Sequence, residues 1–204
     1  MIKTALYIKV KDYDFETLFK KKKYAFFTQG QYNLNIIGVR ASGKQIINSF
    51  DDVLVVVYKT PNGKWTRNVY QITTDPGRYS MINPVNNRGC AILVPGQYRG
   101  AYKIGVHRGK YNALCQTKPV KVYRDNNKDE VYDWDVNNLD DGMFGINIHK
   151  AGLYSKRVDT WSAGCQVFAN SNEFTSFMIL CKKQIASGFD NSFTYTLIKE
   201  EDLV

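Results

Sequence analysis

Runs of apolar residues, rich in β-branched and aromatic side chains, recur along most of the chain, some alternating with polar residues and some continuous. Alternation with a period of two is typical of strands with one buried face, and short continuous runs indicate strands buried on both faces. The pattern predicts strands at residues 32–39, 53–58, 65–72, 91–94, 102–106, 120–123 and 144–148, and a last strand at 192–198. We therefore expect a mainly β fold in which the strands form a sandwich or a closed barrel.

Residues that favour tight turns separate these runs. The segment Pro61-Asn62-Gly63-Lys64 lies between two strand patterns and predicts a hairpin, and Asp75-Pro76-Gly77 predicts a turn. Turn residues at these positions are typical of a chain that reverses direction between neighbouring strands.

Helical spacing of apolar residues is confined to a few segments. The pattern predicts a short helix from Phe15 and a longer one over residues 172–187, with Ser171 as its N-cap and Gly188 at its end. Cys181 lies on the apolar face of the longer helix, so we expect it in the core. A few short helices, one of them near the C-terminus, therefore accompany the strands.

Length and composition indicate a single main folded unit. The chain has 204 residues, of which 44% are hydrophobic, enough for one substantial core. A boundary near Lys23 separates an N-terminal appendage, residues 1–23, from a core domain, residues 24–204.

The chain is strongly basic, with a net charge of +9. This charge attracts polyanions such as nucleic acid, an acidic membrane or an anionic cell-wall polymer. The run Lys20-Lys21-Lys22-Lys23 fits the solvated end of a helix, and an electrostatic anchor is the alternative. No recognised nucleic-acid motif accompanies the basic and aromatic residues, so a specific nucleic-acid partner is not expected.

The N-terminal sequence superficially resembles a signal peptide. However, Lys9, Lys11, Asp12 and Asp14 interrupt its apolar stretch before any small-residue cleavage site. The sequence also has no run of about 18 apolar residues. We therefore expect synthesis in the cytoplasm without a signal peptide, and no transmembrane segment.

Neither the cysteines nor the acidic residues have the spacing of a metal site. The cysteines are far apart along the chain, which argues against zinc and for reduced thiols. An acidic cluster lacks the regular alternation and the glycine of an EF-hand loop, so we interpret it as a solvated loop. No metal or other cofactor is expected. The cysteines are Cys90, Cys115, Cys165 and Cys181, and the cluster comprises Asp129, Glu130, Asp133, Asp135, Asp140 and Asp141.

A histidine and a cysteine occupy the ends of two apolar runs. His149 ends Ile146-Asn147-Ile148-His149, and roughly a dozen residues later Ser162-Ala163-Gly164-Cys165 leads into Gln166-Val167-Phe168. A Cys–His nucleophilic pair has these components, because an imidazole accepts the proton that a free thiol largely keeps at neutral pH. Gly164 permits a tight turn, so that backbone N–H groups of Ala163, Gly164 and Cys165 converge on a developing oxyanion.

This arrangement of a histidine, a gap and then Ser/Thr-x-Gly-Cys resembles the catalytic signature of the L,D-transpeptidases, the YkuD-type domain. The resemblance covers mainly residues 70–170 and includes the turn segments at 73–77 and 92–98. It implies an L,D-transpeptidase-like β-sandwich or barrel and acyl transfer on the stem peptides of peptidoglycan. In that scheme His149 is the base, Cys165 forms the acyl-enzyme, Ser162 shapes the turn and Gly164 belongs to the oxyanion turn. The chain departs from the family pattern at Ala163, where the family has histidine; the backbone donor is retained.

Other residues are candidates for substrate binding. His107 is interpreted as a hydrogen-bonded structural histidine or as a substrate contact lining the cleft. Arg157 is a candidate for holding a substrate carboxylate, and Trp161 for a pocket wall, unless their segment is an ordinary polar loop. A third catalytic group is either Asp159 or a backbone carbonyl that orients the ring of His149.

These observations lead to one expected function and two rivals. We expect a cysteine peptidase or transpeptidase acting on peptidoglycan peptides, with hydrolysis favoured over cross-linking. The expected absence of an export signal favours a bacteriophage-type lysis enzyme, an endolysin that reaches the cell wall after release or delivery. The rivals are a noncatalytic basic binding module and a structural virion or wall-associated protein.

Overall fold

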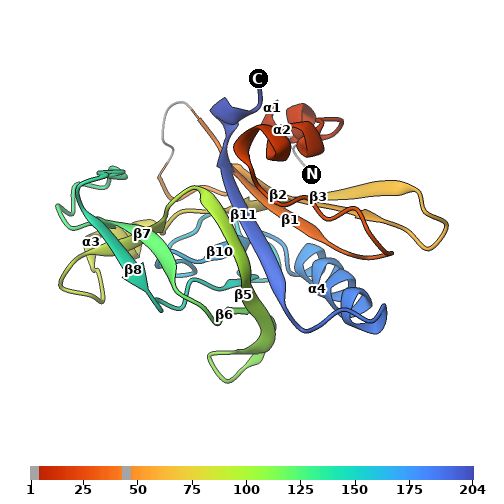
Figure 1. Cartoon of the computed structure of the whole chain (residues 1–204). Coiled ribbons are helices and arrows are strands. Elements are labelled where there is room, and N and C mark those ends of the chain that lie inside the picture. Colours follow the sequence, from red (N-terminus) through yellow and green to blue (C-terminus); the bar gives the residue numbers. More distant parts are fainter. Residues whose placement is uncertain (1–4, 43–46) are drawn as a thin grey trace.

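The computed structural model describes residues 5–42 and 47–204, and the chain is mainly β, which confirms the prediction from the apolar pattern. Eight strands form a closed barrel in the order β1, β11, β5, β6, β9, β10, β3, β2 (Figure 1). Their bounds are β1 Asn35–Arg40, β2 Asp52–Lys59, β3 Trp65–Thr73, β5 Gly96–His107, β6 Tyr111–Gln116, β9 Ile148–Lys150, β10 Gln166–Phe168 and β11 Phe193–Lys199.

Both antiparallel and parallel pairs close the barrel. The predicted hairpin is confirmed, because β2 and β3 pair from Asp52↔Ile72 to Lys59↔Trp65 around the turn that contains Gly63. β11 lies between β1, to which it is parallel, and β5, to which it is antiparallel. β9 and β10 are also parallel neighbours, and this second parallel pair places the candidate site.

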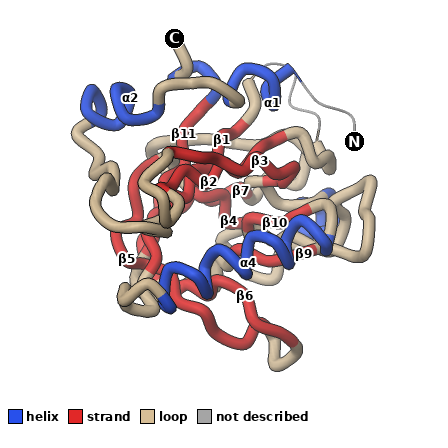
Figure 2. The backbone as a smooth tube through the Cα atoms, turned by 90° about the vertical axis from the view of Figure 1, so that its right-hand side faces the viewer, coloured by secondary structure: helices blue, strands red, loops and turns tan. Residues whose placement is uncertain are grey.

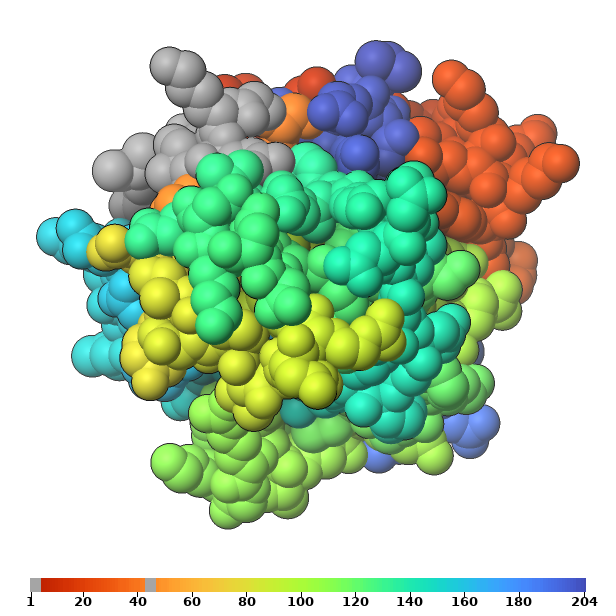
Figure 3. Space-filling view, turned by 90° about the vertical axis from the view of Figure 1, so that its left-hand side faces the viewer, coloured from red at the N-terminus to blue at the C-terminus, as the bar shows by residue number. Residues whose placement is uncertain are grey.

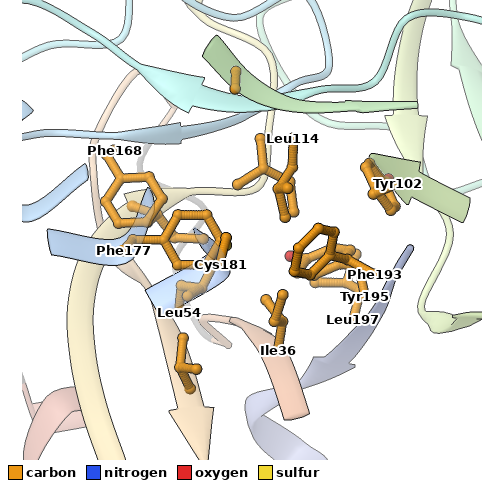
Figure 4. Close-up of a cluster of buried hydrophobic side chains, with 14 of the residues drawn as sticks. Ile36, Leu54, Tyr102, Leu114, Phe168, Phe177, Cys181, Phe193, Tyr195 and Leu197 are labelled. Carbon is orange, nitrogen blue, oxygen red and sulfur yellow. The ribbon is translucent and has the colours of Figure 1, made fainter. Parts of the chain in front are cut away.

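The barrel interior is filled by aliphatic and aromatic side chains (Figure 4). Phe168 and Phe177 lie on one side of this core and Tyr102 and Tyr195 on the other. Phe177 belongs to α4 (Ser171–Ala186), which lies across the front of the barrel in Figure 2 and contacts β9 and β10. Each such buried side chain stabilises the fold by about 1.5–3 kcal/mol. The predicted core position of Cys181 on α4 is confirmed, since it is fully buried.

The N-cap of α4 is Asn170, which corrects the prediction of Ser171. The side-chain oxygen of Asn170 accepts hydrogen bonds from the backbone N–H groups of Asn172, at 2.8 Å, and Glu173, at 3.4 Å. Ser171 is instead the first residue inside the helix. The helix ends just before Gly188, whose φ of +92° is left-handed, and Gly188 is the residue predicted at its end.

Two short N-terminal helices, α1 (Ala5–Val10) and α2 (Phe15–Lys22), cover the outer face of β1 and β2. Alternate residues of these strands therefore face the barrel core and the helices, which explains why β1 is buried along its whole length. The helices also meet the C-terminal turn η1 (Glu200–Asp202), where Lys22 forms an ion pair of 2.6 Å with Asp202. The boundary near Lys23 stays a prediction, and residues 1–4 of the appendage lie outside the described residues.

A smaller sheet of three strands lies beside the barrel, in the order β4 (Cys90–Leu93), β7 (Val120–Asp125) and β8 (Leu139–Gly142). Together with α3 (Arg78–Ile82) it forms the face seen in Figure 3, where yellow and green-to-teal segments lie against each other. Asp140 and Asp141 belong to β8, so the interpretation of the whole acidic cluster as a loop was wrong for these two residues. They pair with Val122 and Lys121 of β7.

Residues 144–148 are not a strand, contrary to the prediction; only Ile148 enters β9. Gly145 has φ +71°, which breaks the extended backbone. The N–H groups of Phe144 and Ile146 donate to the side-chain oxygen of Gln116 instead of to a strand partner. An apolar run can therefore be buried without being a strand, because a side chain satisfies its backbone.

Candidate active site

Strand pairing brings the two predicted catalytic residues to neighbouring positions. In the parallel pair of β9 and β10, His149 is in register with Val167, and Cys165 lies two residues before Val167. Cys165 lies just before β10 and packs against the cluster of buried side chains that contains Val167, so it lies on the face of the barrel wall from which Val167 and His149 project. Ile148 and Phe168 project from the opposite face into the barrel core. The site therefore lies on the outer side of the barrel wall.

The ring of His149 is held in one tautomer. His149 is 4% exposed, and its Nδ1 lies 2.9 Å from the backbone carbonyl of Lys150. A carbonyl only accepts, so Nδ1 carries the proton and Nε2 keeps a free lone pair. The hydroxyl of Tyr111 lies 3.2 Å from the same carbonyl and 3.4 Å from Nδ1. Burial lowers the pKa of His149 to about 4, so the imidazole is a neutral acceptor at pH 7.

His107 is stacked on His149, with ring centroids 4.2 Å apart and an angle of 20° between the planes. Its Nδ1 lies 3.0 Å from the amide nitrogen of Asn147, whose oxygen accepts from the backbone N–H of Gln116 at 2.8 Å. The second bond fixes the orientation of the amide, so Asn147 donates to His107 and the proton of His107 is on Nε2. Burial, followed by the charge of Arg108, lowers the pKa of His107.

Cys165 is half-buried at the end of the turn that precedes β10. Its thiol donates to the carbonyl of Gly145, 3.3 Å away. Burial raises the pKa of Cys165 to about 11, and a backbone hydrogen bond from Asn147 and the charge of Arg108 act in the opposite direction. Within residues 5–42 and 47–204, no hydrogen bond joins the thiol to His149. The resting pair is thus a neutral thiol and a neutral imidazole, and proton transfer requires the thiol to leave Gly145.

Ser162 fixes the turn in front of the cysteine. Its buried hydroxyl accepts from the N–H of Gly164 at 3.1 Å and donates to the carbonyl of Cys165 at 2.9 Å. Gly164 has φ +122°, and a Cβ there would lie 2.1 Å from the carbonyl oxygen of Ala91, so only glycine fits. The N–H of Gly164 donates inside the turn, and its expected role as an oxyanion donor stays a prediction. In the described part of the chain, the N–H groups of Ala163 and Cys165 have no hydrogen-bond acceptor.

A buried arginine secures the segment behind this turn. Arg40 donates to the hydroxyl of Thr74 at 2.9 Å and to its carbonyl at 3.1 Å, and forms an ion pair of 3.0 Å with Asp75. Two residues later, the N–H of Gly77 donates to the carbonyl of Ser162 at 2.9 Å. The turn at residues 73–77 therefore ties the Ser162 turn to the barrel.

The loop between the two predicted catalytic residues places Arg157 and Trp161 at the surface. Arg157 is exposed, and Trp161 is 43% exposed beside Gly152. The carboxylate of Asp159 accepts from the side chain of Asn48 at 2.7 Å, and among the described residues no hydrogen bond joins it to His149. The group that orients His149 is thus a backbone carbonyl, one of the two alternatives that the sequence left open.

Three residues of the site were missed at the level of the sequence. Tyr111 and Arg108 belong to the hairpin of β5 and β6, and Asn147 precedes β9. β6 is not among the strands predicted from the apolar runs, and it is the strand that separates β5 from β9 in the barrel. Asn147 is already two residues from His149 in the sequence, but only the strand order brings Tyr111 and Arg108 to His149, and no local pattern signals that order.

No protein-family model, curated protein or solved structure matches this chain. The resemblance to L,D-transpeptidases therefore rests on the sequence motif and stays a prediction. Among residues 5–42 and 47–204, no group of three or more His, Cys, Asp and Glu side chains is placed to hold a metal ion. In the same ranges, no helix has the length and apolarity needed to cross a membrane.

Proposed function

We propose that the chain is an L,D-transpeptidase-like cysteine enzyme that transfers acyl groups from the stem peptides of peptidoglycan. One observation carries the proposal: the Nδ1 proton of His149 is held by the Lys150 carbonyl, which leaves Nε2 as a free base on the strand beside Cys165. A nucleophile, a base and a group that orients the base are the components of such a site.

In the proposed reaction the thiol proton passes to Nε2 of His149 while Sγ of Cys165 attacks the peptide carbonyl carbon. The carbonyl π electrons move to the oxygen and form a tetrahedral oxyanion. When the oxyanion collapses, the C–N bond breaks, and His149 returns the proton to the departing amine. The product is a thioester on Cys165, and the second half of the reaction returns the thiol to its resting state.

The oxyanion is stabilised by the N–H of Cys165, with that of Ala163 as a second donor. Both are free of intramolecular acceptors in the described residues, and Ser162 fixes their turn. Donors fixed before the reaction stabilise developing charge without the cost of reorganisation. The positive charge of Arg108, which lowers the pKa of Cys165, acts in the same direction.

We favour water over an amine as the acceptor, which makes the chain a wall-degrading hydrolase of the bacteriophage type. Cys165 is half-buried, so solvent reaches the position of the thioester. The net charge of +9 supports a long-range attraction to anionic polymers of the cell wall. The rival, a noncatalytic basic binding or structural protein, keeps the same fold without turnover.

The test is incubation of the full chain with purified peptidoglycan, followed by mass analysis of the muropeptides. Hydrolysis releases shortened stem peptides, and transpeptidation gives exchanged or cross-linked ones. Cys165→Ser is the inactive variant, and Cys115→Ser is its matched control because both cysteines are partly exposed. The proposal would be contradicted if the folded wild-type chain left the muropeptides unchanged. It would also be contradicted if Cys165→Ser turned them over at the wild-type rate.

A further inference from the structure

A cavity of about 360 Å³ lies where β11 begins, beside β5 and the last turn of α4. The segment before β1 and Lys118, which follows β6, complete its walls. Cavities of roughly 300–1,000 Å³ have the usual size of sites for small ligands. Neither Cys165 nor His149 lines this cavity, so it is a site apart from the candidate active site.

Two cations and one carboxylate line the cavity, namely Arg99, Lys118 and Asp190. In the described part of the chain, none of the three forms an ion pair. The guanidinium of Arg99 lies 5.6 Å from the ring centroid of Phe27, and Nζ of Lys118 donates to the carbonyl of Arg99 at 3.3 Å. The lining therefore has an excess of positive charge that no ion pair with a described residue compensates.

Hydrogen-bond donors surround one open point beside Gly100, which has φ +55°. A Cβ at this position would lie 2.8 Å from Oγ of Ser192 and 3.3 Å from Nζ of Lys118, so the missing side chain keeps this space open. The N–H of Gly100 donates to Oγ1 of Thr194 at 3.0 Å, which leaves the hydroxyl proton of Thr194 for a ligand. Hydroxyl and ammonium donors thus meet in the cavity from different elements.

Donors of these kinds suit a phosphate group. The fork of Arg99 can bind two phosphate oxygens, and Lys118 adds a point charge. A tetrahedral anion accepts from several directions, whereas a carboxylate accepts close to its own plane. Asp190 repels an anion but accepts from a hydroxyl group. The lining therefore fits a ligand that carries hydroxyl groups next to a phosphate.

The aromatic side chains of the cavity favour a polyol over a nucleoside. Single-stranded nucleic acid binds by stacking its bases on aromatic rings. Here Arg99 lies over the ring of Phe27, and Cζ of Phe189 lies 2.8 Å from the position that a Cβ on Gly30 would take. Both rings are engaged by the protein itself.

We propose that this cavity binds the phosphate group of a polyol phosphate, with Arg99 and Lys118 on the phosphate and Asp190 accepting from a neighbouring hydroxyl. An anionic wall polymer and a free polyol phosphate are the two sources of this chemistry. Cys165 takes no part in the binding, so the inference does not depend on the proposed acyl transfer.

The test is an NMR titration of the full chain with two phosphodiesters of equal charge, bis(glycerol) phosphate and dimethyl phosphate. Only the first carries hydroxyl groups. We expect the amide signals of Gly100 and Ser192 to shift, and the glycerol compound to bind about tenfold more tightly, because it adds a hydrogen bond to a carboxylate. Glycerol 3-phosphate distinguishes the sources: tighter binding of the diester supports the polymer, and tighter binding of the monoester supports the free compound.

Removing either cation should weaken binding of bis(glycerol) phosphate. Arg99→Gln and Lys118→Gln should each raise the dissociation constant about tenfold, because each removes a charge-assisted hydrogen bond. The double variant Lys20→Gln/Lys21→Gln removes two exposed cations elsewhere and should leave the affinity unchanged.

Filling the open point tests the position of the ligand. Gly100→Ala places a methyl group between Ser192 and Lys118 and should weaken binding. Gly63→Ala is the matched control, because Gly63 also has a positive φ, +77°, but has no neighbour within 4 Å of the added Cβ. It carries similar backbone strain and should bind as the wild type does.

Four results would overturn the inference. The first is an absence of shifts at Gly100 and Ser192, and the second is equal affinity for the two phosphodiesters. The third is equal weakening in Lys20→Gln/Lys21→Gln, which would assign the attraction to the overall charge. The fourth is tighter binding of the dinucleotide thymidylyl-thymidine at the same amides, which would make the cavity a nucleic-acid site.

The two proposals of this article fail separately. Cys165→Ser should bind bis(glycerol) phosphate with the wild-type affinity. Binding in the cavity together with unchanged muropeptides would support the inference and reject the acyl transfer. Muropeptide turnover without binding in the cavity would do the reverse.

Discussion

His107 and His149 are stacked at 4.2 Å, yet they hold their protons on different nitrogens. The Lys150 carbonyl fixes the proton of His149 on Nδ1, whereas the amide of Asn147 fixes the proton of His107 on Nε2. At Nε2, His149 is therefore an acceptor and His107 a donor. Two residues of the same type thus differ in chemistry because their neighbours differ.

This difference predicts unequal effects of mutating the two histidines. His149→Gln removes the base and should lower acyl transfer by about 10²–10⁴-fold, the usual contribution of a positioned base. His107→Gln removes the stacked ring but leaves the His149 base, so part of the turnover should remain. Rates of muropeptide release at pH 7 check this. Equal losses in the two variants would contradict the assignment of the base.

Cys165→Ser should remove most activity with little change in thermal stability, because an alcohol is far less acidic than a thiol of nearly the same size. The nucleophile and the base act as a unit, so the Cys165→Ala/His149→Ala double variant should be hardly slower than either single variant. Turnover and melting temperature are measured together. Multiplicative losses in the double variant would show that the two residues act independently.

Alkylation by limiting iodoacetamide separates activation by His149 from simple exposure. Burial raises the pKa of Cys165 to about 11 and also raises the pKa of the partly exposed Cys115. The thiolate fraction alone therefore gives Cys165 no advantage at pH 7, but a neighbouring base does. We expect Cys165 to be labelled first in the wild type. In His149→Gln the alkylation rate of Cys165 at pH 7 should be lower than in the wild type. In this variant the rate should then increase about tenfold per pH unit up to pH 10, because only the thiolate reacts.

The burial of His149 should make the fold sensitive to acid. Its pKa falls from 6.5 to about 4 on folding, so between these values the unfolded chain binds a proton that the folded chain does not. The buried neutral imidazole contributes its full stabilisation above pH 6.5. As the pH falls from 6.5 through about 4, the free energy of unfolding decreases by roughly 3 kcal/mol. Urea unfolding at pH 7 and pH 4.5 measures it. His149→Gln should lose part of this dependence, and an unchanged slope would contradict the burial argument.

Ser162→Ala should weaken both the turn and the reaction. The substitution leaves the N–H of Gly164 and the carbonyl of Cys165 without their partner, which costs about 1–3 kcal/mol of stability. Because the turn also positions the oxyanion donors, kcat should fall more than KM changes. Ser155→Ala, which also removes a serine hydroxyl that accepts a backbone N–H, is the control and should spare kcat. A Ser162→Ala variant with normal kcat would show that the hydroxyl is not needed to shape the turn.

The class of fold, a mainly β sandwich or barrel, could be predicted because many of its strands are long apolar runs separated by turn residues. The hairpin of β2 and β3 and the core position of Cys181 follow from local patterns of this sort. β9 and β10 are only three residues each, too short for a periodic signal, and Gly145 interrupts the apolar run at residues 144–148. Register and strand order depend on the whole barrel, so the local sequence carries no signal of them.

At the site, the candidate catalytic residues could be predicted from the sequence, but their protonation states and hydrogen bonds could not. His149 and Cys165 are marked by their positions next to apolar runs and a glycine turn. The ring of His107 above His149 and the hydroxyl of Tyr111 depend on β6 lying beside β9, whereas the bond of the Cys165 thiol to Gly145 depends on the pairing of β9 with β10. Such contacts arise from tertiary packing between distant segments.

The position of β11 has a consequence for how the protein is made. The strand that closes the barrel, Phe193–Lys199, follows all the other barrel strands in the sequence and is therefore synthesised after them. At about 5–20 residues per second, the edges of β1 and β5 remain open for several seconds of translation. Open strand edges pair readily with other chains. A chain truncated before β11 should therefore aggregate rather than persist as a smaller folded protein.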